Sequence, residues 1–374
     1  MIENSVVIPV FGNEKLLTIL LSTLLGTLDE QCEVIVVDDG HPNMKISEEL
    51  PEGVQLLSNE KNLGFSGAVN KGINAAKGRF ITTINTDILL DKEWLNVTRS
   101  IFNNYDKVGM LCARLIYPDY GLLMHCGAYF GKGYCFNAWR MSSPDFEPAT
   151  KFKKLQAGSD ALATMHRDSL LSVGAYDESY HTSVEDLDLC FRFQQAGFSN
   201  YFTPDIIGYH KTAASGEDRY KKVKEDKKKL FEKWKDHIED ETKEVFEISL
   251  KRFSNNGNEL PERAYFFNLN RKNSEATITA FKEYSGIKQI ALFDFSTYLK
   301  QTPAYYQKTK IDLLAVLPFN HLNLRYPIVY FPDYYNSLED NLYWFENRAN
   351  STDLVFDDAF NLFRFEEIIN RKAK

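Results

Sequence analysis

The stretch from Ser58 to Asp91 constrains the fold of this chain more than any other. After a short loop it predicts a helix over 66–76, because apolar residues recur on one face at helical spacing and small residues keep the other faces slim. Gly78 is expected to cap this helix. A buried strand is predicted over 80–84, and it ends abruptly at Asn85-Thr86-Asp87. Since open α/β sheets present ligand-binding groups at the carboxyl ends of their strands, this stretch predicts an α/β fold with a polar site at this edge.

Three more strands precede this stretch and carry further candidates for the same sheet edge. They are predicted over 5–10, 33–37 and 54–57, with a core helix over 16–28 after the first. Strands that alternate with helices favour a mostly parallel sheet. The second strand runs into Asp38-Asp39, an acidic pair that either binds a ligand or caps the next turn.

The 374 residues are enough for two domains of ordinary size, and a polar run over 254–259 marks the linker between them. We expect a catalytic domain over 1–250 and a smaller α/β accessory domain over 263–374, which serves acceptor binding or the formation of a homo-oligomer. The sequence could also be a piece of a longer protein. In the accessory domain, strands are predicted over 264–269, 289–295, 312–317, 327–331 and 353–356, and helices over 277–284, 337–347 and 360–370.

Charge and cysteine content exclude several classes of protein. A net charge of −8 argues against a nucleic-acid partner. The five cysteines are odd in number, are scattered and form no CxxC pair, which indicates reduced thiols in the cytoplasm. The longest apolar run, 16–28, is too short to cross a bilayer, and no signal peptide is expected before the first strand. We therefore expect a cytoplasmic protein, at most bound to the inner face of a membrane.

A second acidic cluster lies more than a hundred residues after the first. Glu185, Asp186 and Asp188 open a helix whose apolar residues fall on one face and which ends at Gly197. The helix dipole by itself favours acids in the first turn, so this cluster is either structural or catalytic.

These strings together resemble the inverting glycosyltransferases of family 2. Members of its rhamnosyltransferase-like branch carry NxGFxxAxNxG before a strand that ends in NxD, as residues 62–72 and 85–87 do here. Residues 174–197 resemble the family's GxFDExxFxxxEDxDLxxRxxxxG nearly position for position. The resemblance recurs at four places in about the first 215 residues and ends near Ile248. It implies the GT-A fold, the Rossmann-like mixed α/β sheet of nucleotide-diphospho-sugar transferases.

The resemblance also implies how a sugar donor is held. In similar enzymes the second Asp of the pair, here Asp39, accepts the imide N–H of uracil or thymine, which implies a UDP- or dTDP-sugar and rejects cytosine. The backbone around Pro9 and Phe11 would flank the base. The other donor-binding positions that the match carries over are Asn62, Gly64, Asn70 and Asn85.

Asn85-Thr86-Asp87 stands where the family has its DxD motif, with Asn in place of the first acid. The resemblance implies that Asp87, at the last position, contacts Mn²⁺ or Mg²⁺, and such hard cations neutralise the charge on a departing diphosphate. It also implies that His210, on a strand after the second acidic cluster, is a further ligand that admits Mn²⁺. The alternative for His210 is a structural histidine.

By the same match Asp186 is the general base. It would deprotonate an acceptor hydroxyl that attacks the anomeric carbon from the face opposite the nucleotide, so that one displacement inverts the configuration. For the acceptor we expect contacts from Glu185, from Asp160, where many relatives have glycine, and from Trp139 on a surface loop. Asp160 either touches the acceptor or faces solvent.

Departures from the family pattern limit the type of transfer reaction that we expect. The QxxRW motif of processive synthases is missing, so we expect transfer of one sugar at a time to a glycan, lipid-linked or protein-linked acceptor in cell-surface polysaccharide or glycoconjugate synthesis. A lysine-rich helix over 217–236 either packs on the core or rests on anionic lipid beside such an acceptor. Two other functions stay open. One is a sugar nucleotidyltransferase, which the single glycine in 11–15 disfavours, and the other is a sugar-nucleotide-binding module with decayed chemistry.

Overall fold

The computed structural model divides the chain into two compact units. The first comprises residues 1–129 and 139–239, and the second comprises residues 130–138 and 240–374. The described residues are 2–42, 46, 50–119, 121–131, 134–140, 142–180, 183–211, 223–241, 244, 245 and 248, together with 263–268, 289–294, 328–331, 354–356 and 362–363.

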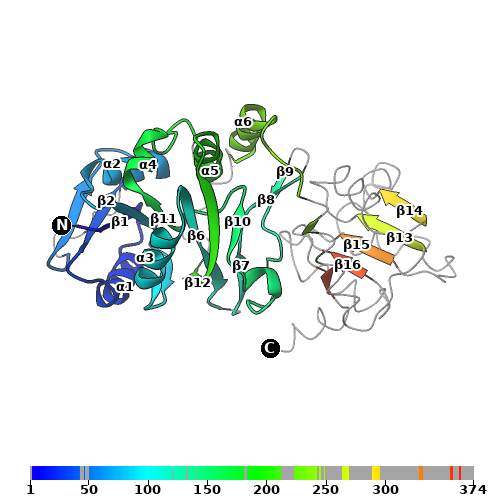
Figure 1. Cartoon of the computed structure of the whole chain (residues 1–374), viewed down its shortest axis with the longest axis horizontal. Coiled ribbons are helices and arrows are strands. Elements are labelled where there is room, and N and C mark those ends of the chain that lie inside the picture. Colours follow the sequence, from blue (N-terminus) through cyan, green and yellow to red (C-terminus); the bar gives the residue numbers. More distant parts are fainter. Residues whose placement is uncertain are drawn as a thin grey trace. The chain divides into compact units, whose positions relative to one another are not determined.

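Four parallel strands form one half of the main sheet in the first unit (Figure 1). Their order is β3 (Val54–Ser58), β2 (Cys32–Asp38), β1 (Asn4–Val10) and β4 (Phe80–Ile84). Val, Ile and Thr are frequent in these strands, and most side chains of β1, β2 and β4 are buried, as strands covered by helices on both faces require. The sequence predicts all four strands to within one residue at either end.

The other half of the sheet is partly antiparallel. β11 (Leu162–His166) lies between β4 and β6 (Val108–Tyr117) and runs antiparallel to both. β12 (Ser199–His210) pairs in parallel with β6. Three short strands complete this half: β10 (Lys153–Leu155) and β5 (Ile88–Leu90) pair with β12, and β7 (Leu122–His125) pairs with β6.

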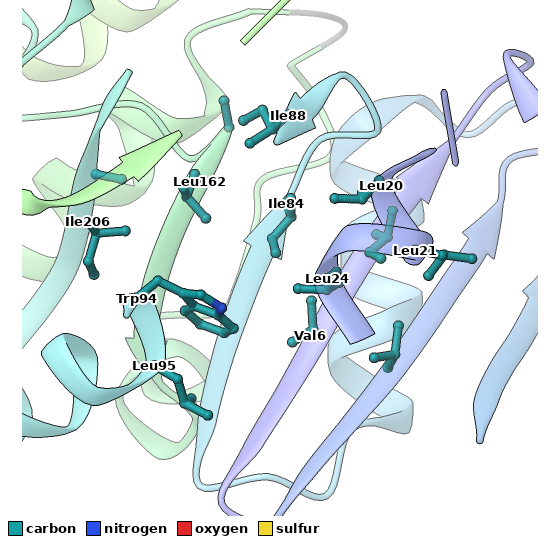
Figure 2. Packing of buried hydrophobic residues seen from close by; sticks show 14 of the residues in the cluster. Val6, Leu20, Leu21, Leu24, Ile84, Ile88, Trp94, Leu95, Leu162 and Ile206 are labelled. Atoms are coloured by element: carbon teal, nitrogen blue, oxygen red, sulfur yellow. The ribbon is translucent and has the colours of Figure 1, made fainter. Parts of the chain in front are cut away.

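Helices cover both faces of this sheet. α1 (Glu14–Leu24), which η1 (Leu25–Thr27) continues, and α3 (Trp94–Asn104) share one buried cluster with the sheet. Figure 2 shows side chains of α1 and α3, among them Leu24 and Trp94, over the strands. This cluster is the main core of the first unit.

α2 (Gly64–Ala75) lies on the opposite face from α1, because Val6 contributes to the α1 cluster whereas its neighbour Val7 faces α2. A Cβ added at Gly72 would lie 2.4 Å from Val7 Cγ1, so the predicted slim helix is needed for this close approach. The prediction that Gly78 caps this helix is wrong. α2 ends at Ala75, and a Cβ at Gly78 would lie 2.6 Å from the Ser5 amide nitrogen.

The remaining helices of the first unit follow the central strands. α5 (Glu185–Gln195) packs against β6, where Cys190 Sγ lies 3.6 Å from Met110 Sδ. Within the described residues, no helix combines the length and the apolar character that crossing a membrane requires. The remaining helices of the first unit are η2 (Glu147–Ala149), α4 (Arg167–Ser172), α5 (Glu185–Gln195) and α6 (Val223–Trp234).

The described strands of the second unit form two small sheets. β8 (Tyr129–Gly131) pairs with β9 (Tyr134–Phe136). The larger sheet is parallel except for its last pair, and its order is β14 (Gln289–Asp294), β13 (Arg263–Asn268), β15 (Ile328–Phe331), β16 (Leu354–Phe356) and β17 (Leu362–Phe363).

The accessory α/β pattern is only partly covered by the described residues. Four of the predicted strands match β13 to β16 to within one residue. The helix predicted over 360–370 is wrong at 362–363, which form β17. The elements predicted over 277–284, 312–317 and 337–347 lie outside the described residues.

Candidate active site

Neighbouring strands of the main sheet end side by side, and predicted site residues follow them. β1 and β2 are in register at Val10 and Asp38, so Phe11 and Asp39 come directly after adjacent strand ends. The Asp39 amide donates to the Val10 carbonyl at 2.8 Å. β4 pairs with the other side of β1 and leads into Asn85. The parallel order therefore brings the predicted donor-binding residues to one edge of the sheet.

The residues expected to flank the base differ in exposure. Pro9 lies near the end of β1, opposite Val37, and is partly buried. The Phe11 side chain is 46 % exposed, and its ring packs edge-on against the His41 ring at 4.8 Å between centroids. Phe11 thus presents an aromatic surface beside Asp39.

The Asp39 carboxylate is buried and holds the loop before α2. Its Oδ1 accepts hydrogen bonds from Asn59 Nδ2 at 2.8 Å and from the Leu63 amide at 2.9 Å. Its Oδ2 accepts from the Gly64 amide at 3.0 Å. Burial raises the pKa of Asp39, against the opposing effect of these donors. The position predicted to read the nucleobase therefore also fixes the start of α2, and its role toward a base stays a prediction.

Asn62 and Gly64 complete this loop. Asn62 Oδ1 accepts from the Gly64 amide at 2.7 Å, so this amide is shared with Asp39. Gly64 opens α2 at φ +80°, in the left-handed region that residues with a Cβ rarely adopt. Glycine is favoured there because it adopts this conformation without a steric cost.

The Asn70 side chain is hydrogen-bonded to other residues of the protein, although it is predicted to contact the sugar donor. Its Nδ2 donates to the Tyr176 carbonyl and to Glu178 Oε1, both at 2.9 Å, and its Oδ1 accepts from the Tyr176 amide at 3.0 Å. Asn70 therefore ties α2 to the loop before α5. This contact joins two of the sequence motifs, and the predicted contact with the donor stays a prediction.

Asp87 and His210 lie together at the end of β12. The antiparallel pairing of β5 and β12 places His210 opposite Ile88, and the Lys211 amide donates to the Asp87 carbonyl at 2.9 Å. His210 Nε2 consequently lies 3.0 Å from Asp87 Oδ1, with both side chains about nine-tenths buried. The buried Nδ1 of the same ring has no hydrogen-bond partner among the described residues.

This pair fits a divalent cation with few protein ligands. Two adjacent ligands of an octahedral ion with bonds of about 2.1 Å lie about 3.0 Å apart, which is the separation of Nε2 and Oδ1. Among the residues that the structure describes, no group of three or more acidic, histidine or cysteine side chains converges on one point. An ion held here by Asp87 and His210 would therefore take its other ligands from water and from phosphate oxygens, as Mg²⁺ usually does.

Asp186 is the accessible acid of the second cluster. α5 begins at Glu185, and of the three acids in its first turn Glu185 and Asp188 are 6 % and 0 % exposed whereas Asp186 is partly exposed. Asp186 Oδ1 accepts from the Leu187 amide at 2.8 Å. Asp186 is thus the most exposed carboxylate of this turn, and its role as the base and the acceptor contact of Glu185 stay predictions.

Asp160 lies in the same neighbourhood as Asp186. Its backbone carbonyl accepts from Thr83 Oγ1 at 2.8 Å, which anchors it to β4, and its side chain is 5 % exposed. Burial, followed by the charges of Asp160 and Asp186, raises the pKa of Tyr176 well above its ordinary value. The alternative that Asp160 faces solvent is therefore wrong, and a contact with the acceptor stays a prediction.

The prediction that Trp139 lies on a surface loop is wrong. The Trp139 side chain is 1 % exposed. Its ring packs edge-on against Tyr129 at 5.1 Å and Phe146 at 5.9 Å, and the Lys153 ammonium lies 5.2 Å from its centroid. Aromatic packing and a cation–π contact thus place it in the core and remove the basis for an acceptor contact.

The sequence pattern misses the residues that hold α5 in place. Asp188 accepts from Arg192 Nε at 2.8 Å, and the i,i+4 spacing of these two residues was a signal for that pair. Trp234 Nε1 also donates to Asp188, at 2.8 Å. No local pattern predicts this second contact, because 46 residues separate the two side chains.

Part of the chain matches a known protein family. Residues 5–172 match the model of glycosyl transferase family 2. The match ends before α5, so it covers the strand-end residues and leaves out Asp186 and His210.

Two curated relatives share low sequence identity with this chain. The uncharacterized protein y4gI of Sinorhizobium fredii is 28 % identical over 226 residues, which are 56 % of this chain and 24 % of that protein. A pre-mycofactocin glycosyltransferase of Mycobacterium tuberculosis is 25 % identical over 209 residues, which are 55 % of this chain and 42 % of that protein. The chain thus spans less than half the length of either relative.

Among solved structures, that of GalNAc-T7 with UDP, GalNAc and Mn²⁺ is similar in fold. It has a TM-score of 0.51 at 15 % identity, over 82 % of this chain and 57 % of that chain. With the mixed sheet of the first unit, this likeness confirms the predicted GT-A fold.

Proposed function

The chain carries a glycosyl transferase family 2 domain, and we propose that it transfers one sugar at a time from a UDP- or dTDP-sugar to a hydroxyl group of an acceptor. The observation that supports this most is the arrangement of three acids on one framework. Asp39 follows β2, Asp87 lies 3.0 Å from His210 at the end of β12, and Asp186 is partly exposed in the first turn of α5. The rhamnosyltransferase-like branch belongs to this proposal.

The donor would bind along the strand ends. Phe11 offers an aromatic surface and Asp39 Oδ2 accepts one amide, which leaves this oxygen a further lone pair for the imide N–H of uracil or thymine. Asp87 and His210 would hold Mn²⁺ or Mg²⁺. When bound, the ion neutralises negative charge that grows on the diphosphate as it leaves.

Asp186 supplies the base. Its carboxylate takes the proton of the acceptor hydroxyl while the hydroxyl oxygen forms a bond to the anomeric carbon. The bond from that carbon to the diphosphate oxygen breaks at the same time, and its electron pair leaves with the nucleoside diphosphate. One displacement inverts the anomeric configuration, and no covalent sugar–enzyme intermediate is needed.

The acceptor belongs to the same proposal. A glycan, lipid-linked or protein-linked acceptor offers the hydroxyl. Two buried acids could orient it: Glu185, which directly precedes Asp186, and Asp160, whose charge acts on Tyr176 together with that of Asp186. A module with decayed chemistry is the second candidate, and it predicts donor binding without turnover.

A donor panel tests the proposal. The full chain is incubated with UDP-, dTDP-, CDP- and GDP-sugars, with Mn²⁺, with Mg²⁺ or with a chelator, and release of nucleoside diphosphate is measured. We expect hydrolysis of uridine or thymidine donors that stops with the chelator. Hydrolysis that is indifferent to metal contradicts the proposed ion site, and metal-dependent binding without hydrolysis favours the decayed module.

A further inference from the structure

Helix α6 lies outside residues 5–172, yet its last turn contacts the helix that carries Asp186. The Trp234 side chain is 4 % exposed, and its ring stacks on the Phe191 ring of α5 at 5.5 Å between centroids. We propose that α6 positions the first turn of α5, and that Trp234 acts on the transfer reaction through its hydrogen bond to Asp188. This inference rests on the proposed function, since it takes Asp186 as the base.

The Asp188 carboxylate gathers donors from three segments. Oδ1 accepts from Trp234 Nε1 at 2.8 Å, lies 2.7 Å from Lys233 Nζ and accepts from the Tyr180 hydroxyl at 3.2 Å. Oδ2 accepts from Arg192 Nε at 2.8 Å. A carboxylate that is 0 % exposed needs such partners, because an unpaired buried charge is strongly destabilising. Two of these four partners, Trp234 and Lys233, come from α6, so Asp188 keeps only Tyr180 and Arg192 among them when α6 is not docked.

The same network reaches the loop that precedes α5. Arg192 Nη1 donates to the Val173 and Ala175 carbonyls at 2.6 and 2.5 Å. Lys229 lies 4.1 Å above the Tyr180 ring and hydrogen-bonds the Ser179 hydroxyl. The loop, α5 and α6 are thus joined in one network, through Asp188 and Arg192 of α5 and through Lys229 of α6.

Backbone strain lies next to Asp186. Val184, which directly precedes α5, has φ +65°, in the left-handed region that a β-branched residue adopts only at a cost. Its carbonyl accepts from the Asp188 amide at 3.0 Å. Surrounding contacts must hold such a conformation, and those of Asp188 flank Asp186 on its C-terminal side. The direction of the Asp186 side chain therefore depends on how firmly Asp188 is bound.

The test removes one hydrogen bond and keeps the packing. Trp234→Phe retains an aromatic ring against Phe191 and loses the N–H that reaches Asp188. Lys228→Ala on the same helix is the matched control, because the Lys228 side chain is 77 % exposed and its ion pair within the described part of the chain is with Glu232, at 3.7 Å. We expect kcat for transfer to fall about tenfold in Trp234→Phe, since small misplacements of catalytic groups are costly, with donor KM unchanged. Lys228→Ala should match the wild type.

A second measurement separates this inference from the proposed function. Amide hydrogen exchange over 184–190 should become faster in Trp234→Phe and stay unchanged in Lys228→Ala, whether or not a substrate is known. If the wild-type chain transfers no sugar, the proposed function fails while exchange still reports on the positioning. Should Trp234→Phe not fold, Lys233→Met removes the 2.7 Å contact instead. Wild-type exchange in a folded variant, or a loss that lies in donor KM, overturns the inference.

Discussion

At the residue scale, a short strand pairing brings two distant side chains together. Asp87 and His210 are 123 positions apart in the numbering, and the β5–β12 ladder sets them 3.0 Å apart in a largely buried place. A buried acid beside a histidine with a second, unbonded ring nitrogen is a costly arrangement for a purely structural purpose. The 3.0 Å separation also equals that of two adjacent ligands of one octahedral ion, which supports the proposed ion site.

The first prediction concerns these two side chains. Asp87→Ala should abolish Mn²⁺-dependent UDP binding, because it removes the charged oxygen ligand. His210→Ala should weaken it by at least about tenfold, the lower limit for loss of even an outer-shell partner. Isothermal titration of UDP with and without Mn²⁺ measures both effects.

A nearby acid provides the control for this titration. Asp91 follows β5, is exposed and interacts through Oδ1 with the Lys92 amide. Asp91→Ala should therefore bind UDP and Mn²⁺ as the wild type does. Wild-type affinity in Asp87→Ala and His210→Ala alike would place the ion elsewhere.

Residue positions were predictable where a motif fixes a residue at a strand or helix end. The positions of Asp39 and Asp87 follow from strand boundaries, and that of Asp186 follows from the start of a helix. The hydrogen bonds of Asp39 and Asn70 were not predictable, because they join residues 24 and 106 positions apart. The prediction for Trp139 is wrong for the same reason, because its burial depends on packing against Tyr129 and Phe146.

At the element scale, α6 is docked on the core rather than spread on a surface. Leu230 and Trp234 are 0 % and 4 % exposed, and Asp226 is also buried, at 2 %. Two of the lysines of α6 face the loop before α5, since Lys229 and Lys233 lie 3.9 and 3.4 Å from Asp177 Oδ2. These contacts support packing of the lysine-rich helix on the core over the alternative that it rests on anionic lipid.

The second prediction uses the charge of Asp177. Burial works to raise the pKa of Asp177, but hydrogen bonds from Ser179 and the charges of Lys229 and Lys233 outweigh it and lower this pKa to about 2. A carboxyl with a lowered pKa in the folded protein stabilises it above pH 4 and loses that contribution as the pH falls toward 2. Lys229→Met should therefore raise the pKa of Asp177 toward 3.8, as measured by NMR titration.

Thermal stability gives the matching readout for Asp177. The Tm difference between wild type and Lys229→Met should be largest at neutral pH and shrink as the pH falls from 4 toward 2, because Asp177 is then increasingly protonated in both proteins. Lys228→Met, on the exposed side of α6, should leave pKa and Tm unchanged. An unaltered Asp177 pKa in Lys229→Met would show that these lysines do not dock the helix.

Elements were predictable where the pattern is local. β1 to β4 and α2 follow from apolar runs, small residues and the polar residues that end them. The central pairings of β6 with β11 and β12 were not, because residues 107–148 lack a clear period and their partners come 50 or more positions later. The end of α2 shows the same limit, since Gly78 is set by the approach of Ser5 rather than by helix capping.

At the scale of the whole molecule, the proposed reaction draws its residues from different parts of one unit. Asp39 and Asp87, proposed for the donor and its ion, lie within residues 5–172, which match the family 2 model, whereas Asp186, the proposed base, lies on α5 beyond the matched residues. The second unit adds a mostly parallel sheet, for which acceptor binding or self-association remains the proposal. A change at Asp186 should therefore separate binding from transfer.

The most direct test of the account is Asp186→Asn. Asparagine keeps an oxygen for the Leu187 amide, so the first turn of α5 should stay intact, and UDP should bind with Mn²⁺ as in the wild type. Transfer should fall by roughly 10²-fold or more, as expected for loss of a general base. Asp205→Asn, which changes an exposed acid on β12, is the control and should transfer normally. Near-normal transfer in Asp186→Asn would contradict the assignment of Asp186 as the base.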